Sequence, residues 1–237
     1  MQKQPCFFFD NLTLSCIISL SLKPPPDIAE LVLASLCQEV PDIKTIKKEK
    51  MPDACAPRRK PDSDSREYRL IMLPNKLDVV LVSDPQTETA AAAVSVSAGQ
   101  LQDPTEVQGL AHFCEHMLFL GSEKFPSESD FDSFCAQSAG YSNAWTGMDR
   151  TVYHFMLAHN KLHDALNRFS GFFTAPLFTE SLTERELHAV DSENNKNLQE
   201  DTRREYQLWR STAKAGSAVQ RFGTGNWQVS LNLKPTH

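Results

Sequence analysis

This sequence of 237 residues lacks closely spaced cysteine pairs, long apolar runs and an excess of positive charge. Its six cysteines are scattered and none forms a Cys-x-x-Cys pair, which argues against a cysteine-ligated zinc site and a dense disulfide scaffold. No run of about eighteen apolar residues exists, so we expect no transmembrane helix and no membrane partner. The formal net charge of −6 argues against a nucleic-acid partner.

The first 63 residues differ in composition from the rest of the chain. There is no arginine before Arg58, which argues against a mitochondrial presequence, and the early apolar patch is too short and interrupted to favour a secretory signal. Residues 42–60 are rich in lysine, arginine and proline, which is typical of a solvated linker. We therefore predict that residues 1–63 are an N-terminal extension, disordered or partly helical, of a cytoplasmic protein with reduced thiols.

The most informative stretch is His112-Phe113-Cys114-Glu115-His116, which lies in a largely apolar segment from Gly109 to Gly121. The apolar residues of this segment cover nearly every direction of a helix, which is typical of a buried helix. Buried titratable groups are costly unless they are paired, hydrogen-bonded or bound to a metal. Three such groups within five residues favour a metal site over the alternative, a core helix whose two histidines are satisfied by hydrogen bonds.

Helix geometry places His112, Glu115 and His116 on one side of the segment, because each residue advances the direction by about 100°. With His112 at 0°, Glu115 lies at about 300° and His116 at about 40°, whereas Cys114 lies at about 200° and points away. Two imidazoles one turn apart can both reach a zinc ion, and a neighbouring carboxylate can reach a water on that ion.

Hydrophobic patterning from about residue 64 predicts a mixed domain. The expected strands are residues 68–73 and 77–82, which form a hairpin, and 90–98, 141–145 and 151–157. One expected helix starts at Asp103, or later because Gly109 lies inside the pattern, and stops at Gly121. A second is capped by Ser127 or Ser129 and ends at Gly140. A third covers 161–174, and a long polar helix runs from a capping box at Ser181 to about Trp209. This order predicts an α+β fold, a two-layer sandwich with helices packed on one face of a mainly antiparallel sheet.

A third protein ligand is needed to complete a catalytic zinc site. The long polar helix carries Glu186 and Glu193, and seven residues bring the direction back to within about 20°, so both acids share a face. Acids on a polar helix are, taken alone, usually solvated. His159 and His163 repeat the four-residue spacing without an acid between them, so we interpret them as capping or surface residues.

Taken together, these motifs resemble the inverzincin metallopeptidases of the pitrilysin/insulinase group, peptidase family M16. The segments that carry the resemblance are HFCEH with the following Met117–Gly121, Asp191-Ser192-Glu193, Tyr141–Trp145, Asp164–Phe169, Pro176-Leu177-Phe178 and Arg221–Asn226. The resemblance covers roughly residues 64–226, so we expect an M16-peptidase-like N-terminal catalytic domain there and a divergent tail over 227–237.

The resemblance implies a zinc-dependent metalloendopeptidase with one zinc ion per chain. His112, His116 and Glu193 match the zinc ligands of the family. Glu115 matches its catalytic base, and Glu186 matches a second acid that supports the site from the same helix as Glu193.

The resemblance also implies partners. Asn143 and Ala144 match an edge strand on which a substrate peptide lies as an added strand, a recognition mode with its own physical basis. Family members resembling this chain are several times longer, and their second half supplies further substrate contacts. A C-terminal half or a full-length homologue is therefore an expected partner beside peptide substrates. The alternative hypothesis is a truncated paralogue, weak or inactive in catalysis, that binds peptides or a partner.

Overall fold

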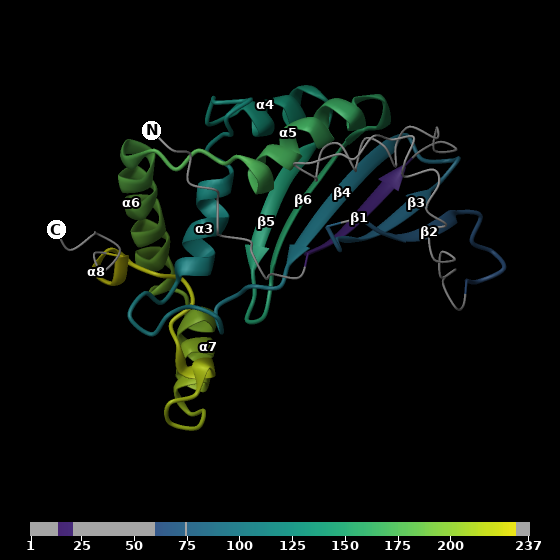
Figure 1. Ribbon diagram of the computed structural model, residues 1–237. Coiled ribbons are helices and arrows are strands. Elements are labelled where there is room, and N and C mark those ends of the chain that lie inside the picture. Colours follow the sequence, from purple (N-terminus) through teal and green to yellow (C-terminus); the bar gives the residue numbers. More distant parts are fainter. Residues whose placement is uncertain (1–13, 21–59, 74, 231–237) are drawn as a thin grey trace. The chain divides into compact units, whose positions relative to one another are not determined.

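The computed structural model describes residues 14–20, 60–73 and 75–230 (Figure 1). The chain divides into two compact units. The first comprises Met1–Ser95, Gly121–Asn143 and Tyr153–Pro176, and the second comprises Val96–Leu120, Ala144–Val152 and Leu177–His237. No helix among the described residues is long and apolar enough to cross a membrane.

A six-stranded sheet has the strand order β2-β3-β1-β4-β6-β5 (Figure 1). Its strands are β1 (Leu14–Leu20), β2 (Glu67–Met72), β3 (Asp78–Ser83), β4 (Thr89–Val96), β5 (Tyr141–Thr146) and β6 (Thr151–Ala158). The predicted hairpin is confirmed, because β2 and β3 pair in antiparallel register with Glu67 opposite Ser83 and Met72 opposite Asp78. Most of this sheet belongs to the first unit.

Strand β1 departs from the prediction for residues 1–63. Leu14–Leu20 form neither helix nor disorder but a strand that pairs in parallel with β3, Ser15 lying opposite Asp78. The β-branched Ile17 and Ile18 suit a strand. Its partner lies far along the chain, and such a non-local pairing leaves no local pattern to find. Apart from residues 60–63, the rest of the predicted extension lies outside the described residues.

Two helices cover one face of the sheet in the first unit, α4 (Asp130–Gln137) and α5 (Leu162–Thr174), with the 3-10 turn η2 (His159–Lys161) before α5 (Figure 1). Phenylalanine side chains join these layers. The rings of Phe131 on α4, Phe155 on β6 and Phe169 on α5 lie with centroids 5.1–5.6 Å apart. Such contacts between aromatic rings stabilise a core beyond simple burial. The predicted α+β sandwich is confirmed.

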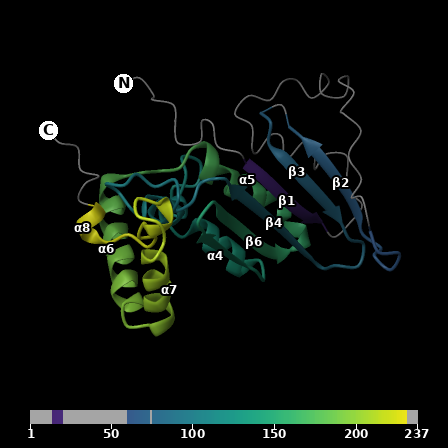
Figure 2. The ribbon, with the colours of Figure 1, turned by 90° about the horizontal axis from the view of Figure 1, so that it is seen from below.

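The second unit is mainly helical. Its helices are α3 (Leu110–Leu118), α6 (Glu180–Asn197), α7 (Asp201–Ser211), the 3-10 turn η3 (Ala218–Gln220) and α8 (Trp227–Ser230). The prediction of one helix from Ser181 to about Trp209 is wrong, because α6 and α7 are separate helices (Figure 2). Glu200 adopts an extended backbone between them. The predicted capping box is also wrong, since Thr179 is the N-cap residue and makes no side-chain cap.

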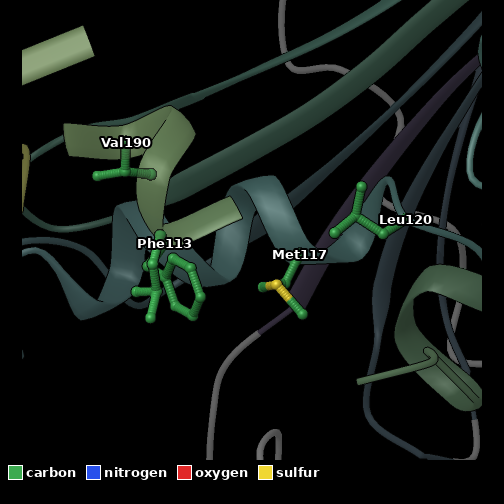
Figure 3. Close-up of a cluster of buried hydrophobic side chains, with 5 residues drawn as sticks. Phe113, Met117, Leu120 and Val190 are labelled. Carbon is green, nitrogen blue, oxygen red and sulfur yellow. The ribbon is translucent and has the colours of Figure 1, made fainter. Parts of the chain in front are cut away.

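A hydrophobic cluster holds α3 against α6 (Figure 3). It contains Phe113, Met117, Leu120, Leu187 and Val190, with Leu182 and Trp227 packed at its edge. Burying one such side chain stabilises a fold by about 1.5–3 kcal/mol. The cluster therefore determines which faces of α3 and α6 meet, and the polar residues beside it on each helix are brought together.

Candidate metal centre

The start of α3 is set by Asp103 and Gly109. The Asp103 carboxylate accepts hydrogen bonds from the backbone N–H of Gly109 at 2.8 Å and of Ala111 at 2.9 Å. Gly109 has φ +91°, and a Cβ at this position would lie 2.3 Å from the Cα of Gly225. Only glycine fits such a backbone at so close an approach. Of the two starts that the sequence leaves open, the later one is confirmed.

The side chains of His112, His116 and Glu193 converge at one point in the second unit. One ligand atom from each lies within 4.8 Å of the others. The Oε2 atom of Glu193 is 3.5 Å from the Nε2 atom of His112 and 3.5 Å from that of His116. The two Nε2 atoms are themselves 3.3 Å apart. Two imidazoles and one carboxylate are a ligand set that catalytic zinc sites use, so these residues could hold such an ion.

Hydrogen bonds orient both imidazoles toward this point. The Nδ1 atom of His112 is 2.7 Å from the carbonyl oxygen of Thr224, which can only accept, so Nδ1 carries the proton. The Nδ1 atom of His116 donates in the same way to Oε1 of Glu186 at 2.8 Å. Each Nε2 is thereby left as the nitrogen that faces Glu193. Partners of this kind fix the tautomer and the ring direction of metal-binding histidines.

The electrostatics of the cluster favour positive charge. Burial lowers the pKa of His116, but its hydrogen bonds with Glu186 and Glu193 outweigh burial and raise the pKa to about 9. The same hydrogen bonds from His116 hold the pKa of Glu186 and of Glu193 below the ordinary glutamate value. Both carboxylates are therefore ionised at neutral pH. A metal ligand such as Glu193 needs this state, and so does Glu186 in order to accept the hydrogen bond from His116.

Glu115 lies beside the three donors but in a different environment. Its side chain is 9% exposed, and the Thr146 hydroxyl donates to its Oε2 atom at 2.5 Å. Burial raises the pKa of Glu115 above the ordinary value, with the Thr146 hydrogen bond acting in the opposite direction. Cys114 is a free thiol outside the donor set, and burial raises its pKa to about 11. A neutral thiol is a poor metal ligand, because the thiolate is the form that binds metals.

The donors line a pocket of about 320 Å³ in the second unit. Its lining residues are Gln100, His112, Glu115, His116, Ala144, Trp145, Thr146, Glu193, Asn197, Arg203, Gly223 and Thr224. Ala144 from the predicted substrate strand thus reaches the pocket. Asn143 precedes it on β5 but belongs to the first unit. The side chain of His163 is exposed, and its Nδ1 atom lies 3.5 Å from Oδ1 of Asp164, which agrees with the surface role predicted for it.

The sequence does not predict the contacts of Thr146, Gln100 and Thr224. Thr146 and Gln100 carry no local pattern that marks them, and Thr224 lies in the segment Arg221–Asn226 of the resemblance, which gives it no role of its own. Asp103 lies before the later of the two predicted starts, and its carboxylate accepts from the backbone N–H groups of Gly109 and Ala111 at the first turn of α3. Contacts made across such distances in the sequence are visible only in the fold.

The family model described as "Insulinase (Peptidase family M16)" matches residues 78–216 of this chain. The chain belongs to the insulinase family. The matched region of this insulinase-family chain includes α3 with both histidines and α6 with Glu186 and Glu193.

Relatives within the family match the same part of the chain. Insulin-degrading enzyme of Drosophila melanogaster is 53% identical over 163 residues, which are 69% of this chain and 16% of the relative. A Schizosaccharomyces pombe protein whose name includes the words zinc protease is 46% identical over 166 residues, 70% of this chain and 17% of the relative. The crystal structure of pitrilysin superposes with a TM-score of 0.69 and 34% identity, over 72% of this chain and 18% of that chain. This insulinase-family chain therefore spans less than a fifth of the length of these relatives.

Proposed function

We propose that the chain carries the catalytic site of a zinc-dependent metalloendopeptidase. The observation that carries this proposal is the convergence of His112, His116 and Glu193 within 4.8 Å, beside the buried carboxylate of Glu115. Membership of a peptidase family supports the same reaction class.

One zinc ion per chain would be held by His112, His116 and Glu193. The donor set fits the ion in type and number, because catalytic zinc takes three protein ligands and keeps a position open. When bound, the ion would lower the pKa of a water and polarise the scissile carbonyl. The pocket of about 320 Å³ around the donors leaves room for the substrate.

Glu115 acts as the general base in this proposal. Thr146 holds the Oε2 atom at 2.5 Å, so the carboxylate has a defined orientation, and Oε1 is the oxygen that receives the proton of the attacking water. Glu115 then passes this proton to the leaving amine as the peptide bond breaks. A base that is held rigidly loses less rate to misorientation than a mobile one.

Glu186 is a positioning residue rather than a ligand. It accepts the His116 Nδ1–H at 2.8 Å and so holds the ring direction that the site requires. Thr224 does the same for His112 through its backbone carbonyl at 2.7 Å.

The substrate peptide would lie along β5 as an added strand, with Asn143 and Ala144 as its contact residues. β5 is the end strand of the described sheet, and an end strand is a template for an extended peptide. Ala144 lines the pocket beside the donors, which supports this placement.

Metal analysis of the purified chain tests the proposal. We expect about one zinc per chain, as a single closed ligand set requires. His112→Ala should lose the ion, whereas His163→Ala, a matched change at an exposed histidine, should keep it. Unchanged zinc content in His112→Ala would overturn the assignment.

The second candidate function is peptide or partner binding without efficient turnover. The short span of this chain favours it, because the matched part is only 16% of the insulin-degrading enzyme of Drosophila melanogaster and 18% of pitrilysin. Cleavage that depends on Glu115 separates the two candidates.

A further inference from the structure

A second cavity of about 100 Å³ adjoins the metal-centre pocket within the second unit. The two share five lining residues: Gln100, Asn197, Arg203, Gly223 and Thr224. Three arginines of α7, Arg203, Arg204 and Arg210, line the second cavity, and no carboxylate is found among its described lining residues. A cationic cavity is unexpected in a chain whose formal net charge is −6.

Arg210 is the central residue of this cavity. Its side chain is 1% exposed, although arginine is almost never fully buried without a charged partner. It donates from Nε to the carbonyl oxygen of Val219 at 2.8 Å and from Nη1 to Oε1 of Gln100 at 2.5 Å. Both acceptors are neutral. Its Nη2 atom is buried without a hydrogen-bond partner in the described part of the chain.

A purely structural arginine would have its donors and its charge satisfied within the fold. Arg210 has neither in full, because Nη2 is unused and no acid among the described residues contacts it. Its charge instead faces the Tyr206 ring, with Cζ 5.6 Å from the ring centroid. The neighbouring arginines do not change this balance: Arg204 pairs with Asp201 at the surface, and Arg203 forms no described ion pair. A buried positive charge is stabilised chiefly by a negative partner, and the part of the chain that the structure describes supplies none at this position.

Gln100 links this charge to the catalytic pocket. Its side chain accepts from Arg210 through Oε1 and donates from Nε2 to the carbonyl oxygen of Thr146 at 3.5 Å. The Thr146 hydroxyl in turn donates to Glu115. One glutamine side chain therefore separates the buried cation from the residue that holds the base.

We propose that this second cavity is a subsite for a carboxylate of the bound peptide, held by Arg203 at the mouth and by the charge of Arg210 behind it. The carboxylate is either an acidic side chain or the free C-terminus of the substrate. The proposal rests on the function proposed above, because the rest of the peptide occupies the adjoining pocket. Arginine suits this role since its guanidinium matches carboxylate geometry.

The test is peptide binding by the full chain carrying Glu115→Gln, which prevents cleavage, measured by fluorescence anisotropy at low ionic strength. Three kinds of matched labelled peptide are compared. The first is a neutral peptide with an amidated C-terminus, and the second is a series of the same amidated peptide in which a single glutamate replaces glutamine at one position after another. The third is the neutral peptide with a free C-terminus. The last two separate an acidic side chain from a terminal carboxylate.

We expect one of the carboxylate peptides to bind more tightly than the neutral amide. Arg203→Gln should lower the ratio of the two affinities by about three- to fivefold, as expected for a partly exposed charge pair. Arg210→Gln should lower the same ratio by about tenfold or more. Both changes should weaken binding of the carboxylate peptide more than binding of the neutral amide, because Arg203 also lines the adjoining pocket. Arg203 is exposed, so its variant keeps the test valid if Arg210→Gln does not fold. Arg69→Gln on β2 removes an exposed arginine outside both cavities and is the matched control.

Equal binding of all three peptides by a chain that holds zinc would overturn the subsite and leave the proposed function standing. A carboxylate preference that survives Arg203→Gln would overturn it as well. A preference abolished by Arg203→Gln in a chain that holds no zinc would support the subsite while the proposed metal chemistry fails.

Discussion

Glu115 and Glu193 are the same residue type in two environments, and at the residue scale this difference assigns their roles. Glu193 is half exposed and has Oε2 at 3.5 Å from both imidazoles. Glu115 is buried, and a hydroxyl holds its Oε2 atom. The first geometry supports the proposed role of Glu193 as a ligand, and the second supports the proposed role of Glu115 as the base.

Glu115→Gln should therefore leave zinc affinity nearly unchanged, while Glu193→Gln should weaken it by well over tenfold because one of three protein ligands loses its charge. Zinc titration of the two variants against a competing chelator measures both. Loss of zinc from Glu115→Gln with retention by Glu193→Gln would mean that the two roles are exchanged.

Thr146→Val keeps the shape of the side chain and removes the hydrogen bond to Glu115. Because hydrogen bonds to charged groups contribute about 1.5–3 kcal/mol, we expect Glu115-dependent hydrolysis to fall by about tenfold or more, with zinc content unchanged. Steady-state hydrolysis of a fluorogenic peptide gives the rate, with Thr202→Val, an exposed change on α7, as the control. A rate equal to that of the unaltered chain would remove Thr146 from the mechanism.

At the element scale, the site depends on how α3 starts and on what it packs against. Asp103 and Gly109 set the first turn, and the cluster around Phe113 and Val190 holds α3 to α6. A shift of the helix start would rotate both histidines away from Glu193, since each residue of shift changes the direction by about 100°.

Gly109→Ala tests this dependence. Gly109 and Gly216 both have positive φ, +91° and +78°, but an added Cβ meets Gly225 at 2.3 Å in the first case and nothing within 4 Å in the second. Gly216→Ala should cost only the backbone penalty of about 1–2 kcal/mol. Gly109→Ala should cost clearly more and should also lower zinc affinity. Thermal unfolding and zinc titration check both, and equal losses in the two variants would show that the contact with Gly225 is unimportant.

At the scale of the whole molecule, the arrangement of the site favours zinc binding, whereas the short length of the chain favours slow cleavage. The proposed metal ligands and the base all lie within one compact unit, so we expect zinc binding to need no other part of a longer protein. The resemblance to longer family members implies that a second half encloses the substrate and supplies charge-stabilising donors. Losing even one such donor typically costs about a hundredfold in rate.

We therefore expect the 237-residue chain to hold zinc but to cleave peptides slowly by itself. A fluorogenic peptide assay, with Glu115→Gln as the blank, measures the rate before and after a separately expressed C-terminal half of a related full-length enzyme is added. Addition should raise the rate. Robust turnover by the lone chain, with no gain on addition, would show that this chain is self-sufficient.

The sequence alone determined the features that depend on local periodicity. The shared side of His112, Glu115 and His116 follows from 3.6 residues per turn, and the α+β order follows from apolar spacing along each element. The shared face of Glu186 and Glu193 has the same origin. All of these are properties of a single helix or strand, so they can be read without knowing what packs against it.

Only the tertiary structure decided which elements meet. It paired β1 with β3 in parallel, separated α6 from α7, and brought Thr146 to Glu115 and Gln100 to Arg210. The strand pairing and the two hydrogen bonds join residues far apart in the chain and are set by the burial of apolar side chains elsewhere in the same unit. The break between α6 and α7 is local and lies at Glu200, whose backbone is extended. The hydrophobic effect is non-directional, so a sequence pattern shows that a face will be buried but does not show which residues will cover it.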